Sequence, residues 1–457
     1  MSEYSGYRGL PMLAGLCTME EALGDGLSVE DCVTRLKRMH YCLKRLHRIF
    51  NDRLTAEPVY ELKMGFSLHS HLCAEQATVL RQRVGEMREP PLGMDAVPCV
   101  ALERLFDEIA NAPDTEDLLR GLYLVAVPQL RLEMERYRAD THPLADAPTR
   151  RLLRAALLDM TDIEDYGKQV QSAYGLEETE WSRELGKAWE GELIERQFSA
   201  EPRPFDGVPQ RDARFPDPYN MGVNAEVFLY DKTMPVEPKT LMMYYKRLRE
   251  IDVPEMMASI IAETGDQPWA YYRDMTRQLW DEARHAMMGE VGFAQKGVDW
   301  SKHVMVNFTW SLALNTQLTP KERHAVLYFI EQGLMPKNGK RYEWEVGKES
   351  GNPLSALFQD FDWADEVLHA RVGRDWYVST FEDPKEAVRY GDECWSRVLL
   401  DWQKYRETGL TEHRNWWPDC YRTACNVANI KPEEGVESFG VSYAEVRADL
   451  KNVSASA

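Results

Sequence analysis

Asp281-Glu282-Ala283-Arg284-His285 and Asp365-Glu366-Val367-Leu368-His369 are two copies of one pattern, D-E-x-x-H, and they decide the fold of this chain. A Glu and a His three residues apart lie on one face of an α-helix, within reach of one metal ion. A single copy arises easily by chance, but two copies with apolar neighbours favour a buried metal site. Two E-x-x-H helices can hold two metal ions when each of two other helices supplies one further Glu. We therefore expect two more buried glutamates.

The charge balance of the chain excludes several classes of protein. Lys and Arg number 55 against 75 Asp and Glu, which gives a net charge of −20. A chain this acidic lacks the basic surface that nucleic acid or anionic lipid requires. No stretch approaches the ~18 apolar residues of a membrane span, and the N-terminus lacks a signal-peptide pattern. The eight cysteines form no C-x-x-C pair, which favours free thiols and a cytoplasmic protein.

The length and the hydrophobic pattern predict two helical domains. A chain of 457 residues is too long for one core, and apolar residues recur at helical spacing in both halves, so we expect an all-α fold. A stretch rich in Pro, Gly and Asp around residues 199–222 indicates a long loop. The predicted divisions are an arm (1–27), a helical domain without a recognisable metal site (28–175), a linker (176–235), a metal-binding four-helix bundle (236–408) and a tail (409–457).

Two residues compete for the ligand position on the helix before the first motif. The turn that joins this helix to the motif helix is short, so the two helices run antiparallel. Glu250 and Glu282 lie equally far from the turn and therefore at equal depth, which favours Glu250. Pro254 forbids a straight helix, however, and predicts a new helix with Glu255 in its first turn, beside apolar residues. We favour Glu255 and keep Glu250 as the alternative.

Glu331 is the candidate ligand between the two motifs. It follows the apolar segment 325–330, and a carboxylate there is costly to bury without a partner. The spacing to either motif leaves room for one helix and a loop. Glu343 and Glu345 are weaker candidates, because they lie among other charged residues, as is typical of a solvated helix face.

The chain resembles the ferritin-like di-iron carboxylate superfamily over about 140 residues, from Glu250 to Tyr390. The resemblance rests on six candidate ligands, which are Glu255, Glu282, His285, Glu331, Glu366 and His369. It implies a ferritin-like four-helix bundle that holds two Fe ions or an Fe/Mn pair. It also implies that Glu282 and Glu366 bridge or span the two ions, that Glu255 and Glu331 are terminal ligands, and that each His binds one ion.

The chemistry of these side chains agrees with the resemblance. Four carboxylates and two imidazoles are hard oxygen and nitrogen donors that suit Fe or Mn, and the set contains no thiolate to select zinc or copper. Asp281 and Asp365 are expected to accept the free ring N–H of a facing His and so to fix its tautomer. Arg284 is a further candidate for this supporting role.

Two hypotheses stay open for the first helical domain, which contains no E-x-x-H pattern. In one, the domain is a degenerate ferritin-like copy, produced by an ancient duplication, that has lost its metal. In the other, it is an unrelated helical domain.

The leading functional hypothesis is an O2-dependent non-haem di-iron oxidase or oxygenase that acts on a small organic substrate. The six candidate ligands would be its catalytic residues, and the loop 335–352 is interpreted as a substrate gate. The chain holds no convincing nucleotide or flavin motif, so electrons must come from an external donor or from the substrate.

Two alternatives to this hypothesis are kept. One is a metal-binding ferritin-like protein without oxidative turnover, and the other is a di-iron hydroxylase that modifies a macromolecule. The acidic charge disfavours tRNA as the substrate but not a protein. A homodimer is the assembly state that we keep open.

Overall fold

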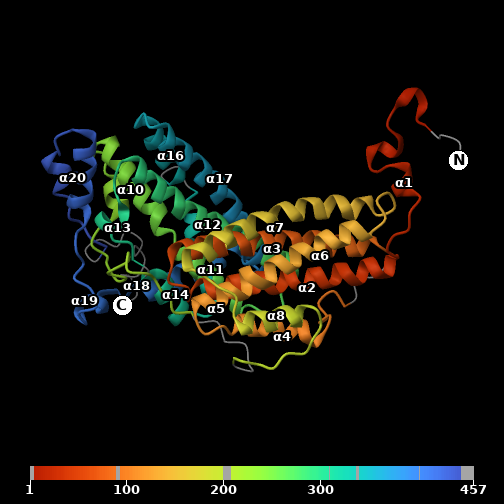
Figure 1. The fold of residues 1–457 in the computed structure, drawn as a ribbon. Helices are drawn as coiled ribbons and strands as arrows, with labels where there is room; N and C mark the ends of the chain where they lie inside the picture. The colour runs from red at the N-terminus through yellow and green to blue at the C-terminus, as the bar shows by residue number, and fades with distance from the viewer. Residues whose placement is uncertain are drawn as a thin grey trace. The chain divides into compact units, whose positions relative to one another are not determined.

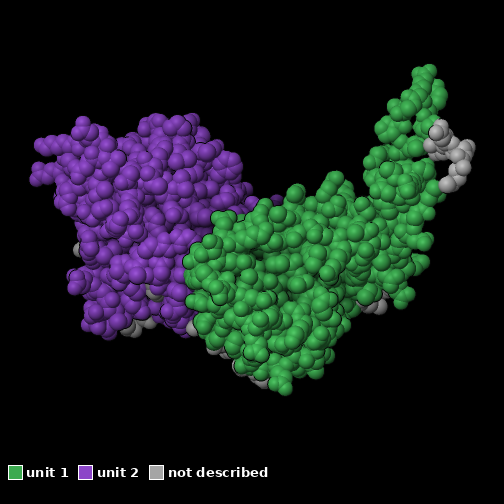
Figure 2. Space-filling view, viewed as in Figure 1, with its two compact units in different colours: residues 1–50, 68–204 green, residues 51–67, 205–457 purple. Residues whose placement is uncertain are grey.

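The computed structural model describes residues 5–88, 93–198, 207–307, 309–335, 339–400 and 402–443. All regular structure in these ranges is helical, as predicted, and they contain no strand (Figure 1). The chain divides into two compact units (Figure 2). Unit 1 comprises residues 1–50 and 68–204, and unit 2 comprises residues 51–67 and 205–457. Within the described ranges, no helix combines the length and apolar character that a membrane crossing requires.

Unit 1 is built mainly from long amphipathic helices whose apolar faces pack together. In chain order its elements are η1 (Tyr7–Gly9), η2 (Met12–Gly15), α1 (Met19–Ala22), α2 (Val29–Leu54), α3 (Tyr60–Glu86), α4 (Val100–Ala110), α5 (Thr115–Leu119), η3 (Arg120–Ala126), α6 (Val127–Asp140), α7 (Ala147–Tyr174) and α8 (Glu180–Trp189). The end of α2 from residue 51 and the start of α3 up to residue 67 belong to unit 2. Pro128 predicts a kink in this part of the chain, and the structure has the π-helical turn η3 there, immediately before α6, of which Pro128 is the second residue. Proline lacks the N–H that a continuous helix needs at this point.

Unit 2 contains the two D-E-x-x-H helices, α12 (Trp269–Gln295) and α17 (Pro353–Trp376). Its other elements are α9 (Ala225–Tyr230), α10 (Val236–Arg249), α11 (Asp252–Glu263), α13 (Trp300–His303), α14 (Thr309–Gln317), α15 (Pro320–Gly333), α16 (Lys340–Glu349), η4 (Val378–Thr380), α18 (Pro384–Leu400), α19 (Trp402–Glu407), α20 (Trp417–Ala428) and α21 (Glu434–Glu437). Helix α12 packs against α10, α11 and α17, and α15 packs against α11, α17 and α18. The break that Pro254 predicts lies between α10 and α11.

Several segments that the sequence assigns to loops are helical. The predicted linker 176–235 contains α8 in unit 1 and α9 in unit 2, while its residues 199–206 lie outside the described ranges. The predicted gate 335–352 is largely α16, which packs against α17 and α10. Conversely, residues 300–318, whose hydrophobic spacing predicts one helix, contain two, α13 and α14.

The predicted tail 409–457 contributes to the core of unit 2. Trp416 and Trp417 are almost fully buried, and their rings pack against Tyr245 and Phe228. Two large aromatic side chains bury enough apolar surface to hold α20 in place. Residues 444–457 of the tail lie outside the described ranges.

The boundary between the units differs from the predicted one because residues 51–67 belong to unit 2. The side-chain amide of Asn51 donates to the carbonyl of Ala258 at 3.1 Å, and Lys63 pairs with Glu255 at 2.9 Å. Both contacts join residues about 200 positions apart, a distance at which local sequence pattern carries no information.

Helices α10 and α12 approach each other closely at Gly289. A Cβ atom on Gly289 would lie 2.3 Å from the backbone nitrogen of Leu248 and 2.5 Å from the carbonyl oxygen of Tyr244. Glycine is therefore required here for the two backbones to touch.

The variant Gly289→Ala should lower the free energy of unfolding of the protein by about 2 kcal/mol, because an added methyl group forces packed helices apart. Urea unfolding followed by circular dichroism measures the change. Gly85→Ala is the control, since its Cβ would meet nothing within 4 Å on α3. It should cause no loss, because Ala is the better helix former. A loss of equal size in both variants would contradict this account.

Burial lowers the pKa of three histidines of unit 1. The pKa of His40 and that of His47 fall to about 4, and the pKa of His69 falls to about 3. The ring of His69 lies against the rings of Phe50 and Tyr166. Its Nδ1 atom is 2.9 Å from the Tyr123 hydroxyl.

The buried ring of His69 should make unit 1 sensitive to acid. The unfolded chain takes up a proton near pH 6.5, whereas the folded chain resists protonation down to about pH 3. Stability is therefore complete above pH 6.5 and falls by about 1.4 kcal/mol per pH unit below it for this one residue. His69→Phe should reduce the slope of stability against pH between pH 6 and pH 4 by that amount in urea titrations. An unchanged slope would contradict burial as its origin.

Candidate metal centre

Helical segments of unit 2 bring seven acidic and imidazole side chains to one buried cluster. Glu250 follows the end of α10, and α12, α15 and α17 supply the rest. The complete set is Glu250, Glu282, His285, Glu331, Asp362, Glu366 and His369. All are buried except Glu250, whose side chain is 18% exposed. The groups of such residues that could hold a metal, among the residues the structure describes, all lie in this cluster.

The cluster divides into two candidate metal positions that share carboxylates. We call the group Glu282, Glu331, Glu366 and His369 the His369 position. We call the residues around the other imidazole the His285 position, which comprises Glu250, Glu282, His285, Asp362 and Glu366. The donor atoms of the His369 position lie within 4.8 Å of one another, and at the His285 position the same holds within two overlapping groups, Glu250 with Glu282 and His285, and His285 with Asp362 and Glu366. Glu282 and Glu366 occur at both positions, as carboxylates that span two ions would.

Each imidazole directs its Nδ1 atom toward three carboxylates. His369 Nδ1 lies 3.0 Å from Glu282, 3.5 Å from Glu366 and 4.0 Å from Glu331. His285 Nδ1 lies 3.4 Å from Glu250, 3.5 Å from Glu282 and 3.6 Å from Asp362. These are the separations at which one ion between the donors would contact each of them.

The Asp residues of the two motifs support the imidazoles in a crossed arrangement. Asp365 lies 3.1 Å from Nε2 of His285, and Asp281 lies 3.5 Å from Nε2 of His369. Arg284 joins the two carboxylates, with its Nη2 atom 2.6 Å from each. The geometry is the one expected from sequence, in which each Asp orients the His of the facing helix.

The electrostatics of the cluster show how strongly these groups interact. Burial alone would lower the pKa of His285, but contacts with Asp365, Glu250 and Glu282 raise it to about 10. Burial would likewise raise the pKa of Asp281, yet hydrogen bonds from His369 and two arginines hold it below its usual range. Burial and the neighbouring Glu366 raise the pKa of Glu331 well above its usual value. In the protein without metal, imidazolium charges therefore compensate part of the acidic charge.

Several buried polar atoms of the cluster lack a hydrogen-bond partner in the protein and could instead bind a metal ion. Among the described residues, no hydrogen-bond partner in suitable geometry reaches Glu250 Oε2, Glu282 Oε1, His285 Nδ1, Glu331 Oε2, Glu366 Oε2 or His369 Nδ1. Each buried polar atom without a hydrogen-bond partner lowers the stability of the folded protein by about 1–3 kcal/mol. The set is also made of the hard oxygen and nitrogen donors that iron and manganese prefer. The residues present therefore fit a pair of such ions.

The structure places Glu255 outside the cluster and Glu250 inside it, which reverses our preference between them. The carboxylate of Glu255 is fully buried and pairs with Arg211 at 2.9 Å and with Lys63 at 2.9 Å. Ser311 donates a further hydrogen bond at 2.8 Å. The apolar surroundings of Glu255 suggested a ligand, but its partners are two cations that lie far away in the sequence. The argument from equal depth was sound despite the break at Pro254.

The other five candidates lie together, and one residue of the cluster, Asp362, was missed. Asp362 is one turn before Glu366 on α17, so the spacing Asp362-x3-Glu366-x2-His369 was a usable signal for a third donor on that face. Glu343 is buried and pairs with Lys246 and Arg247, contrary to the expected solvated face. Glu345 pairs with Arg341 at the surface of α16.

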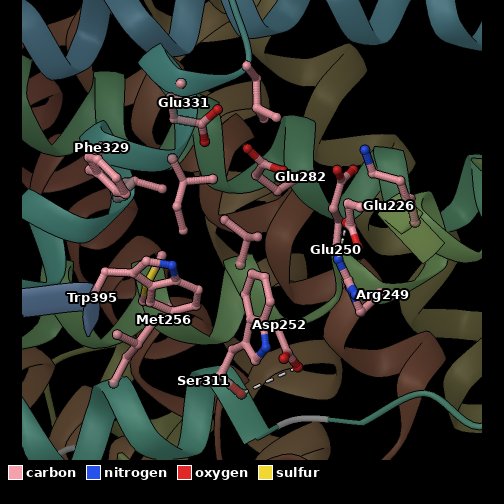
Figure 3. A pocket seen from close by; sticks show the side chains of 18 of the residues that line it. Glu226, Arg249, Glu250, Asp252, Met256, Glu282, Ser311, Phe329, Glu331 and Trp395 are labelled. Carbon is pink, nitrogen blue, oxygen red and sulfur yellow. Dashed lines mark hydrogen bonds and ion pairs between the residues drawn. The ribbon is translucent and has the colours of Figure 1, made fainter. Parts of the chain in front are cut away.

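A cavity of about 330 Å³ adjoins the cluster (Figure 3). Four cluster carboxylates line it, those of Glu250, Glu282, Glu331 and Glu366. Most of the remaining wall is apolar, and it includes Val253, Met256, Trp310, Leu314, Leu327, Phe329, Ile330, Leu334 and Trp395. Figure 3 shows Glu282 and Glu331 at one end of this space and Asp252 and Ser311 at the other. A cavity of this size and character is typical of a small-molecule site.

No protein-family model, curated protein or solved structure matches this chain. What the cluster does must therefore be argued from its own geometry.

The variants Glu250→Gln and Glu255→Gln should separate a metal ligand from a structural ion pair. Glu250→Gln removes a donor of the His285 position, so Mn2+ binding at that position should weaken at least tenfold in equilibrium dialysis. Glu255→Gln should leave Mn2+ affinity within twofold of the original. It should lower stability by about 3 kcal/mol, because Lys63 and Arg211 lose their buried counter-charge. Loss of Mn2+ binding in Glu255→Gln alone would reverse the assignment.

Proposed function

We propose that this chain is an O2-dependent non-haem di-iron oxidase or oxygenase, with an Fe/Mn pair as the alternative centre, built on a ferritin-like four-helix bundle. The observation that carries the proposal is the buried carboxylate and imidazole cluster, open to an apolar cavity. The cluster by itself would serve a metal-binding protein. The adjoining cavity, with carboxylates of both metal positions in its wall, favours an enzyme that presents its centre to a small organic substrate.

The residues that would hold the two ions follow from the donor groups. Glu331 and His369 belong to one position, and Glu250, His285 and Asp362 belong to the other, while Glu282 and Glu366 belong to both. When bound, the ion pair supplies the oxidation of the substrate by O2. Electrons come from an external donor or from the substrate, in line with the lack of a nucleotide or flavin motif.

The protein's own contribution is orientation and exclusion of water. Asp281, Asp365 and Arg284 hold the two imidazoles in place, so that both Nδ1 atoms point into the cluster. The apolar part of the wall would displace water from the space beside the carboxylates and so strengthen the electrostatic interactions there, although Glu226, Lys246 and Arg249 also line the cavity.

The far end of the cavity offers an anchor for a polar group of the substrate. Asp252 is buried, and its Oδ1 atom pairs with Arg211. Among the described residues, its Oδ2 atom has no hydrogen-bond partner. A substrate with an apolar body and one hydrogen-bond donor at its end would satisfy this oxygen while its body lies along the apolar wall. This arrangement would fix which carbon lies near the carboxylates.

Metal loading and O2 consumption test the proposed function. Protein loaded anaerobically with ferrous iron should bind close to two Fe per chain. It should then consume O2 repeatedly when a chemical reductant is present, because the centre is returned to its reduced state. A metal-binding protein without turnover would consume O2 only once per centre, and that result would overturn the proposal.

Two variants and one control locate the activity. Glu282→Ala removes a carboxylate that both positions share, and His369→Ala removes an imidazole. Each should lower iron content and reduce repeated O2 consumption by at least 100-fold. Glu345→Gln changes a surface Glu of α16 that pairs only with Arg341 among the described residues, and it should leave both measurements unchanged. Undiminished O2 consumption in Glu282→Ala would rule out this cluster as the centre.

A further inference from the structure

The two metal positions differ in the cations that contact their carboxylates. At the His369 position, Glu331 accepts a hydrogen bond from the amide of Gln278 at 3.0 Å. Within the described ranges, neither Glu331 nor Glu282 forms an ion pair with Lys or Arg, and the carboxylate of this position that does is the shared Glu366, which pairs with Lys340. The His285 position differs, because its carboxylates are paired with two buried cations, Lys340 and Arg247.

Lys340 already occupies carboxylate oxygens that a metal at the His285 position would use. Its Nζ atom lies 2.9 Å and 3.0 Å from the two oxygens of Asp362 and 2.7 Å from Glu366 Oε1. It is also 3.9 Å from Glu250 Oε1. The side chain is fully buried, so solvent does not screen these contacts. Lys340 is the first residue of α16, which packs against α17 and α10 and holds the ammonium group in place.

Arg247 supplies a second, permanent charge on the same side of the cluster. Its guanidinium pairs with Asp362 and lies 2.9 Å from Glu250 Oε1. The side chain is 1% exposed, and a guanidinium does not lose its proton in proteins. Arg247 therefore pairs with two of the five donors at the His285 position, and its charge does not depend on pH.

The charge balance predicts what these cations do to metal binding. The cluster contains five carboxylates, and Arg247 and Lys340 contribute two positive charges. Three negative charges therefore remain uncompensated when the imidazoles are neutral, as metal ligation requires. One divalent ion reduces this excess to a single negative charge. A second divalent ion turns the excess into a positive charge inside a buried site, and such burial is unfavourable.

We infer that the two positions load in a fixed order. The His369 position binds a divalent transition-metal ion first and tightly. The His285 position binds a second ion at least tenfold more weakly, because Lys340 competes for Asp362 and Glu366. This inference rests on the proposed two-metal centre. It assigns Lys340 as the residue that makes the metal affinities of the two positions unequal. It makes the protein a one-metal species at low metal supply and a two-metal species only when a second ion is available.

Titration of the metal-free, full-length protein with Mn2+, followed by electron paramagnetic resonance, tests the order of loading. Up to one equivalent, the bound Mn2+ should give the six-line spectrum of an isolated ion. Magnetic coupling between neighbouring ions should appear only as the second, weaker ion binds. Two ions that bind with equal affinity, with coupling from the first additions onward, would overturn the inference and leave the two-metal function intact. Absence of bound Mn2+ would instead overturn the proposed function.

Removal of the competing ammonium tests the role of Lys340. Lys340→Met keeps the length of the side chain without its charge, so the second dissociation constant should fall at least tenfold and the first should stay within twofold. Lys63→Met is the matched control, because Lys63 is also a buried lysine paired with a buried Glu, but outside the cluster. It should leave both constants unchanged. Two unaltered constants in a folded Lys340→Met protein would overturn the role of Lys340.

The two imidazoles provide a test that does not depend on Lys340. His285→Ala should abolish the weak binding event and preserve the tight one. His369→Ala should abolish the tight event and leave only weak binding. The reverse pattern would overturn the assignment of the tight site to the His369 position.

Discussion

The burial of acidic charge in the cluster is the constraint on which the rest of unit 2 depends. Buried carboxylates are stable only when counter-charges or metal ions compensate them. The structure supplies compensation from three directions: the crossed Asp and His pairs of α12 and α17, Arg247 at the end of α10, and Lys340 at the start of α16. The packing of α10, α12, α16 and α17 around one another follows from this need as much as from their apolar faces.

A second buried charge network stabilises the same unit without belonging to the proposed centre. Arg211 pairs with both Asp252 and Glu255, and Lys63 pairs with Glu255 as well. The two carboxylates respond in opposite directions: burial raises the pKa of Asp252 to about 7, while the two cations overcome burial and lower that of Glu255 to about 2. This network attaches residues 51–67 to unit 2. It also explains why a buried Glu in apolar surroundings is not by itself evidence for a metal ligand.

Short-range pattern predicted much of the fold and part of the cluster. The break at Pro254 and the helices that bear the two motifs follow from proline geometry and from helical spacing, both local properties. The contact between Asp365 and His285 of the facing helix could also be predicted from the motif. The Asp and His of each motif lie on one helix face, so both point toward the other motif helix. Lys340 could not be placed in the same way. It stands in a charged stretch after a loop, and only the packing of α16 against α17 brings its ammonium group to Asp362 and Glu366.

The position of the cavity determines from which side a small molecule would reach the proposed centre. Its wall contains four cluster carboxylates but neither imidazole nor Asp362. The imidazoles lie behind the carboxylates, where Asp281, Asp365 and Arg284 hold them. Glu331, which has no Lys or Arg ion pair among the described residues, and Glu250, which lies near both Arg247 and Lys340, both border the same space. A substrate in the cavity would therefore meet both halves of the centre at once, and the unequal charge of those halves would act on it directly.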